Sequence, residues 1–206
     1  METLVYTLDI FGCAIFAATA VLVAARKGMD LFGVVTLALA TAVGGGTLRD
    51  MALGVTPVFW VQDTTYIWAP ALAAVVCFVI LRYRSLPERA LIIADAFGLA
   101  VFSAHGAQKV CDTCSSPLIA VVMGVMTGCA GGMIRDILCA EEPLILKREI
   151  YATAALAGAI VYVALRWAGA PDAACMTLAG LATLALRLAA IRWRLALPTI
   201  KRSSAP

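Results

Sequence analysis

Charged side chains are scarce in this sequence: Asp, Glu, Lys and Arg make up 14% of its 206 residues, against about 25% in soluble globular domains. Hydrophobic residues make up 63%, and the mean hydropathy is +0.94. A chain of this length cannot bury so much apolar surface in a water-soluble core. The composition therefore excludes a soluble enzyme or a nucleic-acid-binding module and predicts an integral membrane protein.

Histidine is nearly absent, since His105 is the single one in the chain. This excludes a metal or haem site built from several histidines of one chain. Most of the seven cysteines lie in apolar stretches, where they behave as small hydrophobic residues. Cys111 and Cys114 form the one CxxC motif, which is a weak metal or redox signal. Because the sequence also offers no nucleophile–base arrangement and no phosphate-binding loop, we expect no enzymatic activity, cofactor or resident metal.

Seven apolar runs have about the length of a membrane-spanning helix, which needs about 20 residues. They are nearly free of charge and lack the ten-residue alternation of barrel strands. The sequence therefore predicts an all-α protein with a single membrane domain over residues 1–206 and seven transmembrane helices. The predicted spans are 4–25, 31–54, 66–81, 90–108, 117–139, 150–165 and 173–188, followed by a basic extension to 197 and a tail at 198–206.

Basic residues are distributed unequally between the two sides that seven spans define. The positive-inside rule places the richer side, and with it the C-terminus, in the cytoplasm, so that the N-terminus lies outside. Trp60, Tyr66, Trp68 and Trp167 fall near the outer ends of spans, where aromatic rings anchor helices at the interface. The richer side holds twelve of the 16 basic residues: Arg26, Lys27, Arg82, Arg84, Arg89, Lys147, Arg148, Arg187, Arg192, Arg194, Lys201 and Arg202.

An internal duplication is the most informative feature of the chain. Asp9-Ile-Phe-Gly12 matches Asp95-Ala-Phe-Gly98, and 86 positions separate the two segments. The same offset relates, without a gap, Phe16 to Phe102, Gly45-Gly46 to Gly131-Gly132, Arg49-Asp50 to Arg135-Asp136 and Pro57 to Pro143.

Each copy of the duplication contains three spans. Repeats with an odd number of spans insert with opposite orientation, and transporters and channels of this type place their pathway at the repeat interface. The sequence thus predicts a 3+3 inverted repeat plus a seventh helix. The first repeat covers 4–81, the second 90–166, and the seventh helix with its extension 173–197.

Glycines interrupt the second and the fifth predicted spans. They permit a kink or an unwound turn, whose freed carbonyls can replace part of the hydration shell of a cation. Glycine pairs also permit close helix packing, which is the alternative reading. The predicted pore residues, with two threonine hydroxyls on the same helix face, are Thr41, Gly44, Gly45, Gly46, Thr127, Gly128, Gly131 and Gly132.

Other repeated polar residues are candidates for gating and for the pore mouths. Three roles stay open for the arginines: they gate the pore, hold the following aspartates, or reach the membrane surface. The first and fourth spans each carry an aspartate, which either attracts cations at a mouth or caps a helix. A lone histidine more often bonds neighbouring helices than senses pH. These candidates are Arg49, Asp50, Arg135 and Asp136 for gating, and Asp9, Asp95, Ser103 and His105 for the mouths and a polar patch.

The doubled motif resembles the prokaryotic TRIC proteins, the trimeric intracellular cation channels, which carry two glycine-transporter-type domains. The resemblance rests on Gly44-Gly-Gly-Thr-Leu-Arg-Asp50 and on Gly131-Gly-Met-Ile-Arg-Asp136 and covers about 4–188. It implies a homotrimer in a bacterial or archaeal cell membrane, with a pore in each protomer past the kinked second and fifth helices. The expected partners are permeant K⁺ or Na⁺ and membrane lipids, including bound lipid, without nucleic acid.

Two functions therefore compete at the level of the sequence. The first is a passive channel for monovalent cations. The alternative is a secondary transporter of a small amino acid such as glycine, because inverted repeats with broken helices also suit alternating access.

Overall fold

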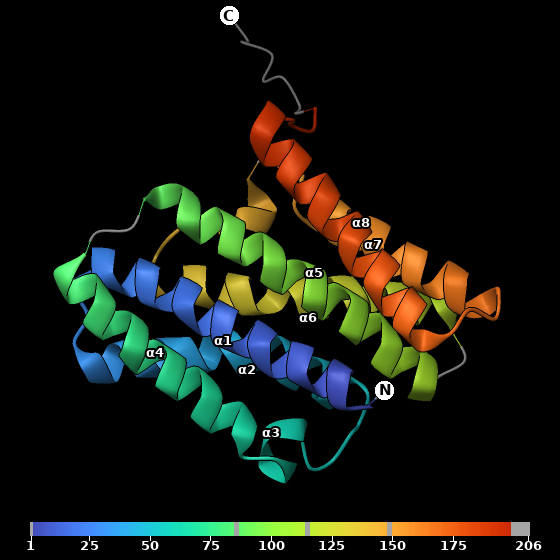
Figure 1. Cartoon of the computed structure of the whole chain (residues 1–206), viewed down its shortest axis with the longest axis horizontal. Coiled ribbons are helices and arrows are strands. Elements are labelled where there is room, and N and C mark those ends of the chain that lie inside the picture. The colour runs from blue at the N-terminus through green and yellow to red at the C-terminus, as the bar shows by residue number, and fades with distance from the viewer. Residues whose placement is uncertain (1, 85–86, 114–115, 148–149, 199–206) are drawn as a thin grey trace, which may run out of the picture.

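The protein is all-helical in the computed structural model, which describes residues 2–84, 87–113, 116–147 and 150–198 (Figure 1). Cys114, Arg148 and the tail residues Lys201 and Arg202 lie outside the described residues. The helices are α1 (Glu2–Arg26), α2 (Leu31–Ala52), α3 (Phe59–Gln62), α4 (Thr65–Tyr83), α5 (Glu88–Thr113), α6 (Pro117–Leu138), η1 (Leu144–Leu146), α7 (Ala152–Trp167) and α8 (Asp172–Trp193).

Six of these helices are long and apolar enough to cross a membrane, and α7 is a shorter apolar helix of 16 residues. All seven predicted runs form helices, and their ends agree within a few residues except that α5 continues to Thr113 and α8 to Trp193, five residues beyond the predicted ends of these two spans. Local signals explain several boundaries. The Asp30 carboxylate accepts a hydrogen bond from the Gly33 amide at 2.7 Å and caps α2, and Pro117 opens α6 where no amide hydrogen is needed.

Two short helices were not predicted, and both follow a repeated proline. Helix α3 begins two residues after Pro57, and η1 directly follows Pro143. Each is tied to the preceding long helix by the repeated aspartate. The Phe59 amide donates to Asp50 at 3.1 Å, and the Leu144 amide donates to Asp136 at 3.2 Å. The repeat therefore extends to these turns, although their sequences differ.

The two repeats meet through reciprocal contacts. The rings of Phe16 and Phe102 lie 5.0 Å apart, centroid to centroid. Each glycine of the pair packs on the other repeat's ring, since Gly12 faces Phe102 and Gly98 faces Phe16. The Gly12–Phe102 contact becomes the Gly98–Phe16 contact when the two repeats are exchanged, which is the mark of a two-fold relation. The structure thus relates α1, α2 and α4 to α5, α6 and α7 by an approximate two-fold axis.

The repeated glycines of α2 and α6 lie at the crossing of these two helices. A Cβ at Gly45 would collide with the carbonyl oxygen of Thr127, and one at Gly131 would collide with that of Thr41. Both helices are α-helical throughout, so the unwound turn with freed carbonyls that the sequence allowed is wrong, while a kink at these glycines stays a prediction. The physical reason is that the absent side chains let the backbones approach closely while each helix keeps its own hydrogen bonds.

Helix α8 lies outside the repeats and packs against α5 and α7 (Figure 1). It ends on the same side of the molecule as α1 and α4, where α5 begins. We call this side the basic end, because it exposes Lys27, Arg82, Arg84, Arg192 and Arg194. The other side, where α1 and α8 begin, is the opposite end.

Candidate functional site

A cavity of about 410 Å³, which we call the vestibule, opens at the opposite end between α1, α4, α5 and α8. All four helices contribute polar side chains to its lining, and α1 and α8 also contribute apolar ones. The phenol of Tyr66 donates to the Asp9 carboxylate at 2.7 Å, and Nε2 of His105 lies 3.8 Å from the same carboxylate oxygen. The polar lining residues are Tyr6, Asp9, Tyr66, His105, Gln108, Asp172 and Thr177.

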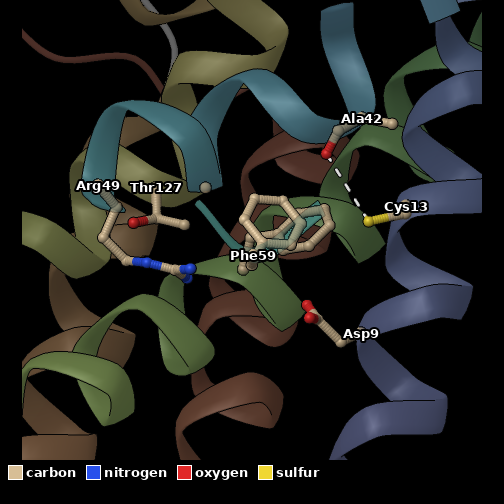
Figure 2. Close-up of a pocket in the computed structure, with 8 residues that line it drawn as sticks. Asp9, Cys13, Ala42, Arg49, Phe59 and Thr127 are labelled. Atoms are coloured by element: carbon tan, nitrogen blue, oxygen red, sulfur yellow. Dashed lines mark hydrogen bonds between the residues drawn. The ribbon is translucent and has the colours of Figure 1, made fainter. Parts of the chain in front are cut away.

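Asp9 also lines a second, much smaller space deeper in the protein, which we call the chamber. Its volume of about 10 Å³ is enough for roughly one water molecule. In Figure 2 the guanidinium of Arg49 and the carboxylate of Asp9 lie on opposite sides of the Phe59 ring. The chamber is lined by Asp9, Cys13, Ala42, Gly46, Arg49, Phe59, Phe102 and Thr127, so five helices of both repeats contribute.

The first Arg-Asp pair forms one wall of the chamber. Nε of Arg49 donates to Asp50 at 2.9 Å, and Nη2 lies 2.8 Å from the same oxygen. The guanidinium also stands 5.8 Å from the centre of the Phe59 ring. Asp50 uses its second oxygen to hold the Phe59 amide. One aspartate thus positions both the arginine and the aromatic ring that fill the chamber.

The second Arg-Asp pair lies toward the basic end and takes more partners. Nε of Arg135 donates to Asp136 at 2.8 Å, while Nη1 donates to Asp95 and to the Thr19 hydroxyl, both at 2.8 Å. The Arg135 side chain is 1% exposed. These four residues, which we call the Arg135 network, join α1, α5 and α6 and fill the space between them.

The two halves are therefore not equivalent in their ion pairing. Thr19 corresponds to His105 through the 86-residue offset, and Asp95 corresponds to Asp9. Arg135 binds Thr19 and Asp95, but within the described part of the chain no bond joins Arg49 to His105 or Asp9. Asp9 instead accepts from Tyr66. In the half at the basic end a guanidinium binds the carboxylate of Asp95, whereas in the other half the carboxylate of Asp9 lies at the wall of the vestibule.

The remaining predicted residues fall into two groups. The Thr127 hydroxyl donates to the Met123 carbonyl at 2.6 Å, and the Thr41 hydroxyl donates to the Leu37 carbonyl at 2.7 Å. Thr127 and Gly46 line the chamber, whereas Thr41 is buried at the helix crossing with Gly45 and Gly131. The others contact neighbouring elements: Gly44 faces Ile134, Gly128 faces Leu99 and Ser103, Gly132 faces Tyr151 and Asp95, and Ser103 bonds Thr183 at 3.3 Å.

Two interpretations from the sequence need correction. Asp9 and Asp95 do not cap helices, because each lies seven residues inside its helix, and their polar surroundings come from neighbouring helices. Tyr66 does not anchor the protein at the interface, since it is 9% exposed and turned toward Asp9. Trp68 and Trp167, by contrast, are 72% and 73% exposed.

Sequence reasoning missed several residues of the site and misplaced one. Phe59 and Cys13 line the chamber, yet nothing in the repeat singles them out. Arg187, counted with the basic extension, is 1% exposed and lies within α8. Its guanidinium stands 5.1 Å above the ring of Tyr151, which lies beside Asp95 and Gly132. A basic residue at the sixteenth position of an apolar helix was the available signal.

Carboxylates outnumber guanidiniums around the chamber and the Arg135 network. Arg49 pairs with Asp50, and Arg135 pairs with Asp95 and Asp136, while the carboxylate of Asp9 binds neither arginine. Among the residues that the structure describes, no group of three or more His, Cys, Asp or Glu side chains is arranged to hold a metal ion. An excess of carboxylates attracts cations electrostatically.

The family model for the glycine transporter domain matches the chain twice, at residues 6–82 and 92–167. The chain is 48% identical over 198 residues to the UPF0126 inner membrane protein YadS of Escherichia coli K12, covering 95% of this chain and 96% of that protein. It is 46% identical over 198 residues to a UPF0126 membrane protein of Vibrio cholerae, covering 96% and 83%.

Solved structures agree with these relatives. The TRIC trimeric intracellular cation channel orthologue from Rhodobacter sphaeroides is 44% identical, with a TM-score of 0.90 over 94% of this chain and 100% of that one. A prokaryotic TRIC channel crystallised in 0.5 M KCl is 30% identical, with a TM-score of 0.88 over 96% and 100%. A trimeric intracellular cation channel from C. elegans, at 13% identity and a TM-score of 0.60, shares the fold. With two domain matches, an inverted repeat and close relatives over nearly its whole length, the chain belongs to the prokaryotic TRIC family.

Proposed function

We propose that this protein is a passive channel for the monovalent cations K⁺ and Na⁺, with one pore inside each protomer. The observation that carries the proposal is that Asp9 borders both the vestibule and the chamber. A carboxylate in that position concentrates cations where the pathway narrows. Two arginines in a cation pathway would repel the permeating ions, but each is paired with at least one carboxylate here.

The proposed route runs from the vestibule past Asp9, through the chamber and along α2 and α6 to Asp95. The hydroxyls of Thr41 and Thr127 donate to carbonyls of their own helices, which leaves oxygen lone pairs free to replace water around a cation. Since α2 and α6 are unbroken, hydroxyl and carboxylate oxygens supply the coordination, and the glycines set the spacing of the two helices.

The Arg135 network forms the gate of this proposed pore. A chamber of about 10 Å³ is too small for a hydrated cation, so this conformation is closed. Opening requires the Arg135 guanidinium to leave Asp95 and the Phe59 ring to move from the chamber. The Arg49 pair narrows the pore at the other end.

The membrane arrangement follows from charge and similarity. We propose seven spans, with the N-terminus outside and the basic end in the cytoplasm of a bacterial or archaeal cell membrane. Helix α7 is about 24 Å long at 1.5 Å per residue and crosses the bilayer beside the longer α8. The homotrimer is proposed from the trimeric channels that this chain resembles.

A second function, secondary transport of glycine, is favoured by the description of the matching domain. Purified protein in liposomes separates the two. A channel gives a current whose reversal potential follows an imposed K⁺ gradient without added amino acid. A transporter gives saturable uptake of labelled glycine and no such current. Uptake without the K⁺ current would reject the channel, and empty liposomes serve as the control.

A further inference from the structure

The vestibule at the opposite end has a lining that suits one class of small molecule. Its volume of about 410 Å³ lies within the range of about 300–1,000 Å³ that is usual for small-molecule sites. Two carboxylates and two tyrosine rings line it, and none of its described lining residues is lysine or arginine. The apolar lining residues are Val5, Leu8, Ala173 and Met176. Such a lining favours a ligand with a positive charge and an apolar body.

The carboxylate of Asp9 has no lysine or arginine partner among the described residues. Asp9 is 6% exposed, and its carboxylate contacts the Tyr66 hydroxyl at 2.7 Å and Nε2 of His105 at 3.8 Å. Arg49, across the chamber (Figure 2), is bonded to Asp50 instead. A buried carboxylate is costly unless a positive charge lies beside it. A cation that enters the vestibule therefore gains Asp9 as a partner.

The second carboxylate of the lining, that of Asp172, already has a basic partner. Nε of Arg166 lies 3.6 Å from its Oδ1, and the hydroxyl of Tyr162 donates to the same oxygen at 3.0 Å. Asp9 is therefore the carboxylate whose charge a ligand meets first.

Tyr6 and Tyr66 place two aromatic rings in the same lining. Their centroids lie 6.0 Å apart, and their planes are nearly perpendicular, at 88°. Each hydroxyl donates to a carboxylate, that of Tyr6 to Asp63 at 2.8 Å and that of Tyr66 to Asp9, and these bonds hold both rings in place. Aromatic rings attract ammonium groups that come within about 6 Å of their centroids. The lining thus combines charge with cation–π attraction.

We propose that the vestibule binds a small organic ammonium ion, with its charged group beside Asp9 and its carbon chain against the apolar residues of α1 and α8. A neutral molecule would leave Asp9 without a cation, and an inorganic cation would leave the apolar lining without contacts. A free amino acid brings a carboxylate, for which the described lining offers neither lysine nor arginine. Binding itself does not depend on conduction, but competition with K⁺ at Asp9 rests on the proposed function.

Binding of butylammonium to the whole purified protein tests the proposal. Butan-1-ol and butanoate offer a similar short chain with a neutral or a negative head, and glycine represents the amino acids. Calorimetric titration and thermal melting in a non-ionic detergent are measured with each ligand, and empty micelles provide the blank. The variants are Asp9→Asn and Tyr6→Leu. Their matched controls lie outside the vestibule: Asp112→Asn removes a carboxylate at the same end, and Phe11→Leu removes an exposed ring of α1.

We expect butylammonium to bind at least about tenfold more tightly than butan-1-ol, and butanoate and glycine not to bind. Asp9→Asn should abolish this preference, Tyr6→Leu should weaken butylammonium binding about two- to fivefold, and both controls should keep it. Equal binding of butylammonium and butan-1-ol, displacement by glycine, or equal loss in Asp112→Asn would overturn the site. If Asp9→Asn melts well below wild type without ligand, equal affinity in Tyr6→Leu and Phe11→Leu would overturn it.

Recording in planar bilayers separates this site from the proposed function. If the vestibule is the mouth of the pore, butylammonium added at the opposite end lowers the K⁺ current, and a higher K⁺ concentration relieves the block. Binding in solution without any effect on the current supports the ammonium site and rejects the route past Asp9. An intact K⁺ current without binding rejects the ammonium site alone.

Discussion

Arg135 on α6 donates a hydrogen bond of 2.8 Å to Asp95 on α5, while Arg49, its equivalent in the first repeat, is bonded to the neighbouring Asp50. The repeated arginine therefore has different partners in the two repeats. Arg135 joins three helices at the basic end, whereas Arg49 leaves Asp9 at the wall of the vestibule. The same substitution at equivalent positions of the two repeats should consequently have different effects.

Asp95→Asn should raise the open probability of the channel. The amide keeps an acceptor but loses the charge, and hydrogen bonds to charged groups contribute about 1.5–3 kcal/mol. A loss of about 1.4 kcal/mol from the closed state alters the ratio of open to closed channels about tenfold. Single-channel recording in planar bilayers measures this ratio. An unchanged open probability would remove the Arg135 network from the gate.

Asp9→Asn is the matched substitution, and its expected effect is on conductance. Asp9 makes no bond to either arginine in the described residues, so the gate keeps its contacts. Loss of the carboxylate between vestibule and chamber lowers the local cation concentration. Conductance should fall most at low ionic strength, where screening is weakest. If the ratio of variant to wild-type conductance is the same at about 50 mM and at about 1 M salt, Asp9 has no electrostatic role at the mouth.

Gly45→Ala should destabilise the protein, because the new methyl group meets the Thr127 carbonyl across the α2–α6 crossing. Overpacking of this kind costs about 1–3 kcal/mol, and the backbone of a second helix cannot move aside as a side chain can. Gly180→Ala is the control, since its nearest neighbour is 3.8 Å away. In detergent, the melting midpoint of Gly45→Ala should be lower than that of the wild-type protein, and the midpoint of Gly180→Ala should not be lower. Equal midpoints would mean that the crossing is loose.

Phe59→Ala should enlarge the chamber and increase conductance. The ring packs on Gly46, lies 4.8 Å from the Tyr66 ring and fills the space beside Arg49. Its removal costs up to about 3 kcal/mol of stability, at the lower end of values for buried aromatic residues because Phe59 is half-buried. Phe32→Ala on α2 is the control, since that ring is 81% exposed. A conductance no higher than that of the control would place the constriction elsewhere.

Acid should weaken the contact between the ends of α1 and α6. Lys27 lowers the pKa of Glu141 through a hydrogen bond and through its charge. A carboxyl whose pKa is lower in the folded state contributes stability above its unfolded value, here 4.5, and this contribution is lost as the pH falls through the folded value. Lys27→Met should therefore lower the melting midpoint at about pH 6 but not at about pH 3. A difference that persists in acid would assign the effect to packing.

The sequence predicted which residues of the two repeats are equivalent, but it predicted less well which residues contact each other in the folded protein. The 86-residue offset identified Asp9 with Asp95 and Arg49 with Arg135, and the apolar runs located the helices. It could not predict that Thr19 would bind Arg135 while His105, at the equivalent position, would not bind Arg49. That difference depends on how far apart neighbouring helices stand, which periodicity within one helix does not record.

Phe59 and Tyr66 illustrate a second limit. Both lie just after the first repeated motif, in a segment whose partner in the second repeat has a different sequence. Aromatic residues near a span end read as interface anchors, and only the fold of α3 over the end of α2 turns these two inward. The repeated glycines show a different limit. Close helix packing and an unwound turn both require glycine at these positions, so the sequence cannot distinguish the two, and only the backbone of the folded protein does.

The reciprocal crossing of Gly45 with Thr127 and Gly131 with Thr41 has a consequence for how such a chain arises. Two copies that meet through the same residues from both sides are what an antiparallel dimer of one three-helix unit becomes when a linker joins its subunits. Such a unit would carry everything needed to recognise its own inverted copy. Once joined, the copies are free to diverge, as Thr19 and His105 have done, and a symmetric assembly acquires two different ends.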